Sequence, residues 1–188
     1  MPSIKGTKTE INILTAFAGE SQARNRYTFA ASVAAKEGYV KIAAAFTETA
    51  DQEKEHAKRL FRFLEGGEAT ITAGFPAGIK EDTVSQLSAA AAGENHEWTV
   101  MYPEFAKIAK AEGFGEVAVV MENIAVAEKY HEKRYNDFLT EIKNGTFFKK
   151  PEKVSWRCRN CGYVHEGFNE PPDQCPACAH PKAYFEVL

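Results

Sequence analysis

Two short motifs combine a carboxylate with an imidazole at the same spacing. Glu53 precedes His56 by three residues, and Glu128 precedes His131 by three. Residues three apart on a helix lie on one face, so each pair can present an oxygen and a nitrogen to the same interior point. A single pair is weak support for a metal site, because surface helices in a chain with 26 acidic residues produce it by chance.

Both motifs belong to a longer internal repeat. Ala18-Gly19-Glu20 recurs as Ala92-Gly93-Glu94 at an offset of 74 residues, and the Glu-x-x-His motif and a turn glycine recur at an offset of 75. Each half therefore pairs a Glu on its first helix with Glu-x-x-His on its second. Di-iron and di-manganese carboxylate bundles hold their metal pair with this array. The repeat predicts a two-metal site within a duplicated bundle.

The same carboxylates could instead form solvated helix faces. Against this alternative, the apolar stretches Ala43 to Phe46 and Val117 to Val126 precede Glu53 and Glu128 within a few turns. Burying that many carboxylates without cations would cost several kcal/mol each. Bound cations remove this cost, and oxygen ligands with some imidazole suit iron or manganese.

The repeat is imperfect at one informative position. Glu94 is followed three residues later by Glu97, whereas the matching neighbour of Glu20 is Ala23. The second half thus supplies an additional carboxylate. The predicted metal ligands are five glutamates and two histidines: Glu20, Glu53, Glu94, Glu97, Glu128, His56 and His131.

Other polar residues near these motifs need a separate interpretation. Tyr27 and Tyr102 follow the carboxylates closely enough to face the site, either as ordinary core tyrosines or as its hydrogen-bond partners. His96 and Glu55 have no counterpart in the repeat. We therefore expect His96 and Glu55 to face outward.

All four cysteines lie in two Cys-x-x-Cys pairs near the C-terminus. Cys158 and Cys161 form the first pair and Cys175 and Cys178 the second, with 13 residues between the pairs. In a reducing compartment this clustering suits metal binding better than disulfides. Two such knuckles can close a tetrahedral thiolate site for zinc or iron, and the spacing alone favours structural zinc.

Apolar periodicity and glycine stops predict four helices, over about residues 9–35, 39–64, 82–112 and 114–143, with a kink at Pro103. Turns at Gly38 and Gly113 should make each consecutive pair antiparallel. After Gly66-Gly67, a loop of roughly fifteen residues is longer than ordinary bundle turns and is predicted to be a crossover. The expected fold is an all-α four-helix bundle with one long crossover, followed by a small β module.

The domain boundaries follow from composition. We expect the bundle over residues 1–146, a linker over 147–153 and the cysteine module over 154–188. The 44% of hydrophobic residues is enough to fill the core of a bundle. The module is too small to fold on apolar burial alone, so a bound metal should hold it together.

Charge and hydropathy exclude several classes of function. The net charge of -3, from 23 basic and 26 acidic residues, gives no positive surface for nucleic acid or an anionic membrane. The N-terminal residues lack the apolar region of a signal peptide, and no stretch reaches transmembrane length. We expect a cytoplasmic protein with small-molecule chemistry or protein partners.

From Ala-Gly-Glu-Ser-Gln-Ala-Arg-Asn-Arg-Tyr at residues 18–27 to the cysteine module, the chain resembles the rubrerythrin family over essentially its whole length. The resemblance implies a ferritin-like bundle with a di-iron centre. It also implies that Glu97 and His56 alternate as ligands of one iron, the carboxylate when oxidised and the imidazole when reduced. Such an exchange partly balances the charge that the iron pair loses on reduction.

The same resemblance assigns roles to the remaining site residues. It implies Glu20 on the switching iron, Glu94 and His131 on the other, Glu53 and Glu128 bridging both, and Tyr27 and Tyr102 bonded to ligand glutamates.

The cysteine module resembles rubredoxin, a carrier of electrons with a single iron. The likeness lies in Cys161-Gly162-Tyr163, in Cys175-Pro176-Ala177-Cys178 and in Trp156 before the first knuckle. Ala179 departs from the pattern, because stand-alone rubredoxins usually have glycine there. The resemblance implies iron, rather than zinc, at the four cysteines.

Taken together, the resemblance implies a non-haem di-iron peroxidase that reduces hydrogen peroxide to water with electrons relayed through the rubredoxin-like centre. It implies a head-to-tail homodimer and an external donor, rubredoxin or a reductase, that passes on electrons from NAD(P)H. The chain has no nucleotide-binding glycine motif, consistent with an external donor. The alternatives are a ferroxidase and iron-storage protein of the ferritin type, and a zinc-ribbon regulator whose bundle only dimerises.

Overall fold

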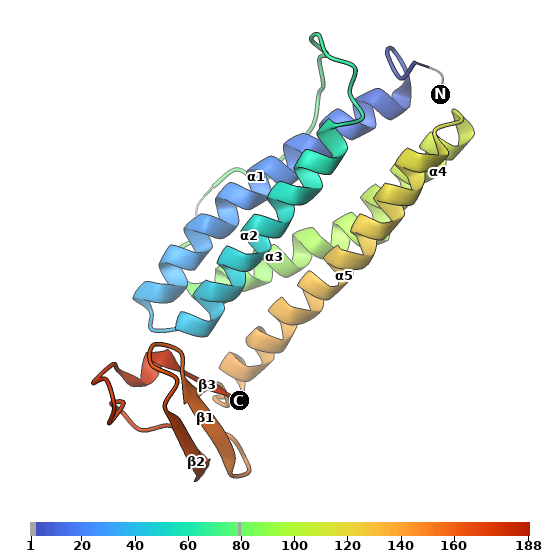
Figure 1. The fold of residues 1–188 in the computed structure, drawn as a ribbon. Coiled ribbons are helices and arrows are strands. Elements are labelled where there is room, and N and C mark those ends of the chain that lie inside the picture. Colours follow the sequence, from blue (N-terminus) through green and yellow to red (C-terminus); the bar gives the residue numbers. More distant parts are fainter. Residues whose placement is uncertain (1–2, 79) are drawn as a thin grey trace.

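The computed structural model describes residues 3–78 and 80–188. Long helices form a bundle, and three short strands form a separate small sheet at one end of it (Figure 1). The predicted four-helix bundle with an appended β module is therefore confirmed. Within the described ranges, no helix is both long and apolar enough to cross a membrane.

The first hairpin consists of α1 (Lys8–Lys36) and α2 (Val40–Phe61). Gly38 reverses the chain between them in the left-handed region, with a φ of 84°. The N–H of Tyr39 bonds to the carbonyl of Ala34 at 2.8 Å, which closes a Schellman motif at the end of α1. This tight turn makes the two helices antiparallel neighbours (Figure 1).

The second hairpin repeats this design. Gly113 has a φ of 87°, and the N–H of Phe114 bonds to the carbonyl of Ala109 at 2.8 Å. The helices of this hairpin are α3 (Thr83–His96), α4 (Tyr102–Ala111) and α5 (Gly115–Lys143). The matching turns support the internal repeat that the sequence predicts.

A π-helical segment, η1 (Glu97–Met101), separates α3 from α4. The sequence predicts one continuous helix kinked at Pro103, and this detail is wrong because the irregularity lies just before that proline. The N–H of Tyr102 bonds to the carbonyl of Glu97, five residues earlier, as in a π turn. Pro103 has no N–H to donate to the preceding turn, so the regular ladder would be broken there in any case.

The π turn also explains why the repeat changes its offset. Glu20 matches Glu94 at 74 residues, whereas Tyr27 matches Tyr102 at 75, so one extra residue lies between Glu94 and Tyr102. The π segment falls in this interval. A π turn holds one residue more than an α turn, and the insertion is absorbed inside the helix without a loop.

Two apolar clusters fill the bundle. One gathers around Phe46, Leu87 and Tyr135, and the other around Ile13 and Met121. On each long helical stretch a glutamate lies between the residues of the two clusters: Glu20, Glu53, Glu94 and Glu128. The carboxylates therefore form a polar layer between two apolar ones.

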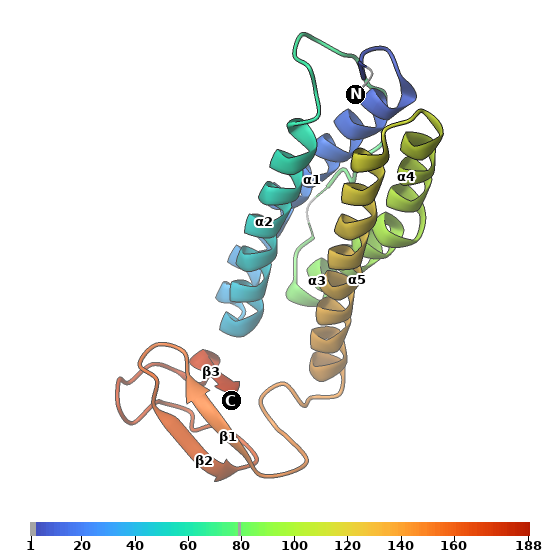
Figure 2. The ribbon, with the colours of Figure 1, turned by 45° about the vertical axis from the view of Figure 1, so that its right-hand side comes forward.

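A long crossover joins α2 to α3, as predicted, and residue 79 within it lies outside the described ranges. It runs back along the bundle (Figure 2). A Cβ on Gly19 would lie 3.9 Å from the ring of Phe75, so the crossover covers α1 beside Glu20.

The C-terminal module is an antiparallel sheet in the order β2-β1-β3. Its elements are β1 (Val154–Cys158), β2 (Val164–Phe168), η2 (Lys182–Tyr184) and β3 (Phe185–Val187). Trp156 and Phe185 are buried in its core, and the Trp156 Nε1–H donates to the carbonyl of Phe168 at 3.0 Å. The module lies at the end of the bundle where α1 turns into α2 (Figure 2), and a Cβ on Gly38 would lie 3.6 Å from the Cβ of Ala183.

Candidate metal centres

The buried glutamates and the two histidines form two overlapping sets of ligand atoms. In each set the atoms lie within 4.8 Å of one another, and Glu53 and Glu128 belong to both. The first set is Glu20, Glu53, His56 and Glu128, and the second is Glu53, Glu94, Glu128 and His131. Two metal ions that share two bridging carboxylates fit this arrangement.

Burial and missing partners test whether cations fit here. The four glutamates are at most 1% exposed. Within the described residues, one oxygen each of Glu20, Glu53 and Glu94 and both oxygens of Glu128 face no polar partner other than a histidine Nδ1. An unpaired buried carboxylate is costly, and native proteins pair such groups or bind metals with them. These residues therefore fit a pair of divalent metal ions.

Both histidines direct Nδ1 into this layer. The Nδ1 of His56 lies 2.9 Å from Glu53 Oε2 and 3.0 Å from Glu128 Oε1. The Nδ1 of His131 lies 2.8 Å from Glu128 Oε2 and 3.2 Å from Glu53 Oε1. Burial opposes the charged imidazole, but the carboxylates outweigh it, raising the pKa of His131 to about 12 and that of His56 strongly. A bound metal ion would displace these protons.

The carboxylates differ in how strongly they hold protons. Burial raises the pKa of Glu94 to about 8 and also raises that of Glu20. Burial acts on Glu53 as well, but bonds from His131 and His56 outweigh it and lower its pKa to about 2. Negative charge is thus favoured on Glu53, which lies between both histidines.

Two tyrosines tie the hairpins together across the site. The Tyr27 hydroxyl on α1 donates to Glu94 Oε1 on α3 at 2.5 Å. The Tyr102 hydroxyl on α4 donates to Glu20 Oε1 on α1. Both tyrosines are buried. Each hairpin therefore orients a glutamate of the other through a hydrogen bond, which is the second of the two roles considered from sequence.

Glu97 is the predicted ligand that belongs to neither set in the described part of the chain. Glu97 lies at the start of η1 and lines a cleft of about 340 Å³. Arg26 of α1 and Phe75 of the crossover line the same cleft. Burial, together with the charges of Glu20 and Glu94, raises its pKa well above the usual range. His56 therefore belongs to a ligand set in this structure, whereas Glu97 does not.

The residues expected to face outward do so. His96 and Glu55 are exposed, and Glu55 pairs with Lys58 at 2.9 Å. Sequence reasoning missed Gln52 and Tyr135. Gln52 Oε1 lies 2.9 Å from His131 Nε2, and the buried ring of Tyr135 packs on that of Tyr27 with centroids 5.6 Å apart.

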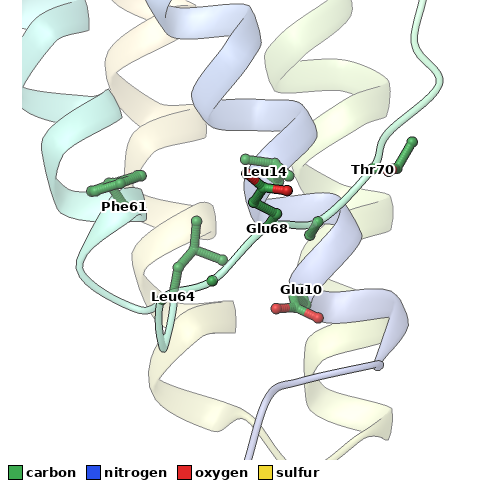
Figure 3. Close-up of a pocket in the computed structure, with 9 residues that line it drawn as sticks. Glu10, Leu14, Phe61, Leu64, Glu68 and Thr70 are labelled. Atoms are coloured by element: carbon green, nitrogen blue, oxygen red, sulfur yellow. The ribbon is translucent and has the colours of Figure 1, made fainter.

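A cleft of about 460 Å³ is lined by both histidines, Gln52 and Tyr130. A cleft of about 490 Å³ at the start of the crossover contains Glu10, Leu14 and Phe61 (Figure 3). None of the predicted ligands lines that second cleft.

The four cysteines form the other candidate centre. Their sulfur atoms lie within 4.8 Å of one another, with Cys158 and Cys178 at 3.8 Å and Cys161 and Cys175 at 3.7 Å. These separations exceed a disulfide bond, and all four thiols are free. A tetrahedron with metal–sulfur bonds of about 2.3 Å has edges of about 3.8 Å, so the thiols fit one metal ion.

The two knuckles share one backbone design. Gly162, with a φ of 80°, donates to the carbonyl of Cys158 at 2.9 Å, and Ala179, with a φ of 57°, donates to that of Cys175 at 2.9 Å. The N–H of His180 lowers the pKa of Cys178 to about 6, which favours the thiolate form that metals bind. The alanine keeps the knuckle geometry at a strained position.

Comparisons with known proteins agree with both centres. The rubrerythrin family model matches residues 12–139, and the model of the rubrerythrin rubredoxin-like domain matches residues 156–186. A rubrerythrin of Nitratidesulfovibrio vulgaris is 62% identical over 188 residues, covering 100% of this chain and 98% of its own length.

Two solved structures extend the likeness to the fold. The fully reduced, all-ferrous state of nigerythrin has a TM-score of 0.64 at 30% identity, covering 98% of this chain and 91% of its own. Mycobacterium tuberculosis bacterioferritin BfrA has a TM-score of 0.65 at 19% identity, covering 75% of this chain and 90% of its own, and supports the fold alone.

A duplicated bundle with two ligand sets that share Glu53 and Glu128 defines a ferritin-like di-iron protein. The fused four-cysteine domain adds a rubredoxin-like centre, which implies a role in electron transfer. The chain belongs to the rubrerythrin family.

Proposed function

We propose that this protein reduces hydrogen peroxide to water at the di-iron site, with electrons supplied through the four-cysteine iron centre. The observation that carries the proposal is the presence, in one chain, of two ligand sets that share Glu53 and Glu128 and of a separate tetrathiolate site. A pair of ferrous ions supplies two electrons, and the reaction consumes two electrons and two protons for each peroxide that becomes two waters. A one-electron carrier then restores the pair in two steps.

The burial of the site favours a small molecule as its oxidising substrate. The carboxylates are almost completely buried, and the approach from solvent is past His56 and His131. An oxidant as small as peroxide fits a site whose carboxylates are buried in this way.

We propose that Glu20, Glu94 and His131 are terminal ligands, that Glu53 and Glu128 bridge, and that His56 and Glu97 exchange at the Glu20 side. His56 within its set and Glu97 in a neighbouring cleft correspond to the arrangement expected for the reduced state. The carboxylate of Glu97 would enter when the irons are oxidised, because the added negative charge balances the added cation charge.

We also propose a head-to-tail homodimer. The module touches the bundle beside Gly38, and the path along α2 from Val40 to Glu53 is about 20 Å at 1.5 Å per residue. Electron transfer slows steeply over such a distance. A second chain placed head to tail would bring its cysteine module to the histidine cleft, and an external rubredoxin or NAD(P)H-linked reductase would supply the electrons.

Anaerobic stopped-flow spectroscopy tests this function. The fully reduced protein is mixed with one equivalent of peroxide per di-iron site, and the visible absorption of the tetrathiolate iron is followed together with that of the oxidised pair. Rapid oxidation of both centres is expected. Slow reaction with peroxide but rapid reaction with oxygen would favour iron oxidation and storage, and zinc at the cysteines would exclude the relay.

A further inference from the structure

The two histidines of the site differ in what holds their outer nitrogen. His131 Nε2 lies 2.9 Å from Gln52 Oε1. His56 Nε2 has no hydrogen-bond partner among residues 3–78 and 80–188, and the His56 side chain is the more exposed, at 17% against 9%. The repeat makes these histidines equivalent, so the difference must come from their neighbours.

The hydrogen bonds around Gln52 fix its orientation. Its Nε2 donates to Glu48 Oε1 at 3.1 Å, and the same oxygen pairs with Nη1 of Arg134 at 3.1 Å. An ionised carboxylate only accepts hydrogen bonds, so the amide N–H₂ of Gln52 must face Glu48. Its carbonyl oxygen is then left for His131, whose Nε2 must carry the proton. This tautomer leaves the Nδ1 lone pair of His131 directed at the carboxylate layer.

The matching place in the other half lacks this hydrogen bond to the histidine. An offset of 75 residues places Ala127 where Gln52 stands and Asn123 where Glu48 stands. Ala127 lines the same cleft as His56 but has no polar side-chain atom. Asn123 bonds to its own helix at the carbonyl of Val119. The counterpart of Arg134 is Arg59, which pairs with Glu116 at 2.7 Å instead.

We infer that Gln52 is a positioning residue that keeps His131 bound to its metal ion by holding the ring in one orientation. Ala127 at the matching place offers no such hydrogen bond, so His56 can dissociate from its metal ion. This inference rests on the proposed exchange between His56 and Glu97 and identifies what decides which histidine moves. Ligand histidines are usually oriented by a partner on the other ring nitrogen, and loss of that partner typically weakens metal binding 10- to 100-fold.

Three variants test the inference: Gln52→Leu, Ala127→Gln and the double exchange of the two. Asn123→Ala is the matched control, because Asn123 is the counterpart of Glu48 in the repeat and its side chain donates to the carbonyl of Val119 on its own helix. Anaerobic chelator competition measures the affinity of each iron, and crystal structures of the all-ferrous and all-ferric forms give the iron–Nδ1 contacts of both histidines.

We expect Gln52→Leu to weaken one of the two bundle irons by about 10- to 100-fold and to release His131, with helix content unchanged. In Ala127→Gln, His56 should remain bound in the ferric form, and the double exchange should make His131 the mobile ligand. If wild-type protein exchanges His56 while Gln52→Leu behaves like Asn123→Ala, the inference is wrong and the proposed function stands. If wild-type His56 stays bound in both oxidation states, the inference and the proposed exchange both fail, whereas the proposed reduction of peroxide is decided by the stopped-flow experiment.

Discussion

Replacing Tyr27 with phenylalanine removes one hydroxyl from the site and little else. That hydroxyl donates to Glu94 Oε1 at 2.5 Å, and the ring packs against Phe46 and Tyr135. Without iron, burial holds the pKa of Glu94 near 8, so at pH 7 the carboxyl is mostly protonated and the lost bond is a neutral one of about 1 kcal/mol. With iron bound, Glu94 is ionised and the same bond is worth about 1.5–3 kcal/mol.

The difference between these two states sets the expected effect on binding. Tyr27→Phe should weaken iron binding on the Glu94 side by about 0.5–2 kcal/mol, or roughly 2- to 30-fold. Anaerobic chelator competition at pH 7 measures this, with Tyr39→Phe as control because that ring stacks on Phe148 away from the site. An affinity within twofold of the control would refute the reasoning that the hydroxyl stabilises the ionised ligand.

Three further predictions concern protons, the knuckle and the core. Iron affinity should rise from pH 6 to pH 8, because Glu94 and His131, with pKa values of about 8 and 12, lose protons on binding, and a flat or falling affinity in the same chelator competition would contradict this. Ala179→Gly should stabilise the module by about 1 kcal/mol in guanidinium unfolding, because it relieves a positive φ, whereas Ala177→Gly should not. Phe46→Ala, at a fully buried ring, should cost about 3–5 kcal/mol in urea unfolding, and a loss below about 1 kcal/mol would show that the core tolerates the cavity.

The repeat made most of the site predictable from sequence. Glu and His three apart on a helix must share a face, and the duplicated motif places two such faces opposite each other. The structure brings Glu53, Glu128 and both histidines together in this way. The apolar clusters on either side of the carboxylates follow from the same periodicity.

The π segment that begins at Glu97 could not be predicted from the sequence. The helix is regular up to Glu97, whose N–H bonds to the carbonyl of Gly93, and the π turn that follows changes the relation of Glu97 to the residues after it. A single extra residue in the repeat is equally compatible with a loop insertion or with a kink at Pro103. Only the backbone hydrogen bonds distinguish these possibilities.

The sequence does contain a signal for the role of Gln52. It is the immediate neighbour of Glu53, and the equivalent neighbour of Glu128 is Ala127. A mismatch inside an otherwise faithful repeat indicates where two similar halves acquire different roles. The added Glu97 is another mismatch between the halves, and both concern the exchange proposed at His56.

The central claim is that the bundle holds two irons through shared carboxylates, and iron titration with Mössbauer spectroscopy tests it most directly. The metal-free chain is loaded anaerobically with ferrous iron and then oxidised with peroxide. The expected result is three irons per chain, one at the cysteines and two in the bundle that become magnetically coupled on oxidation through the bridges Glu53 and Glu128. A single bundle iron, or two that remain magnetically isolated, would contradict the account.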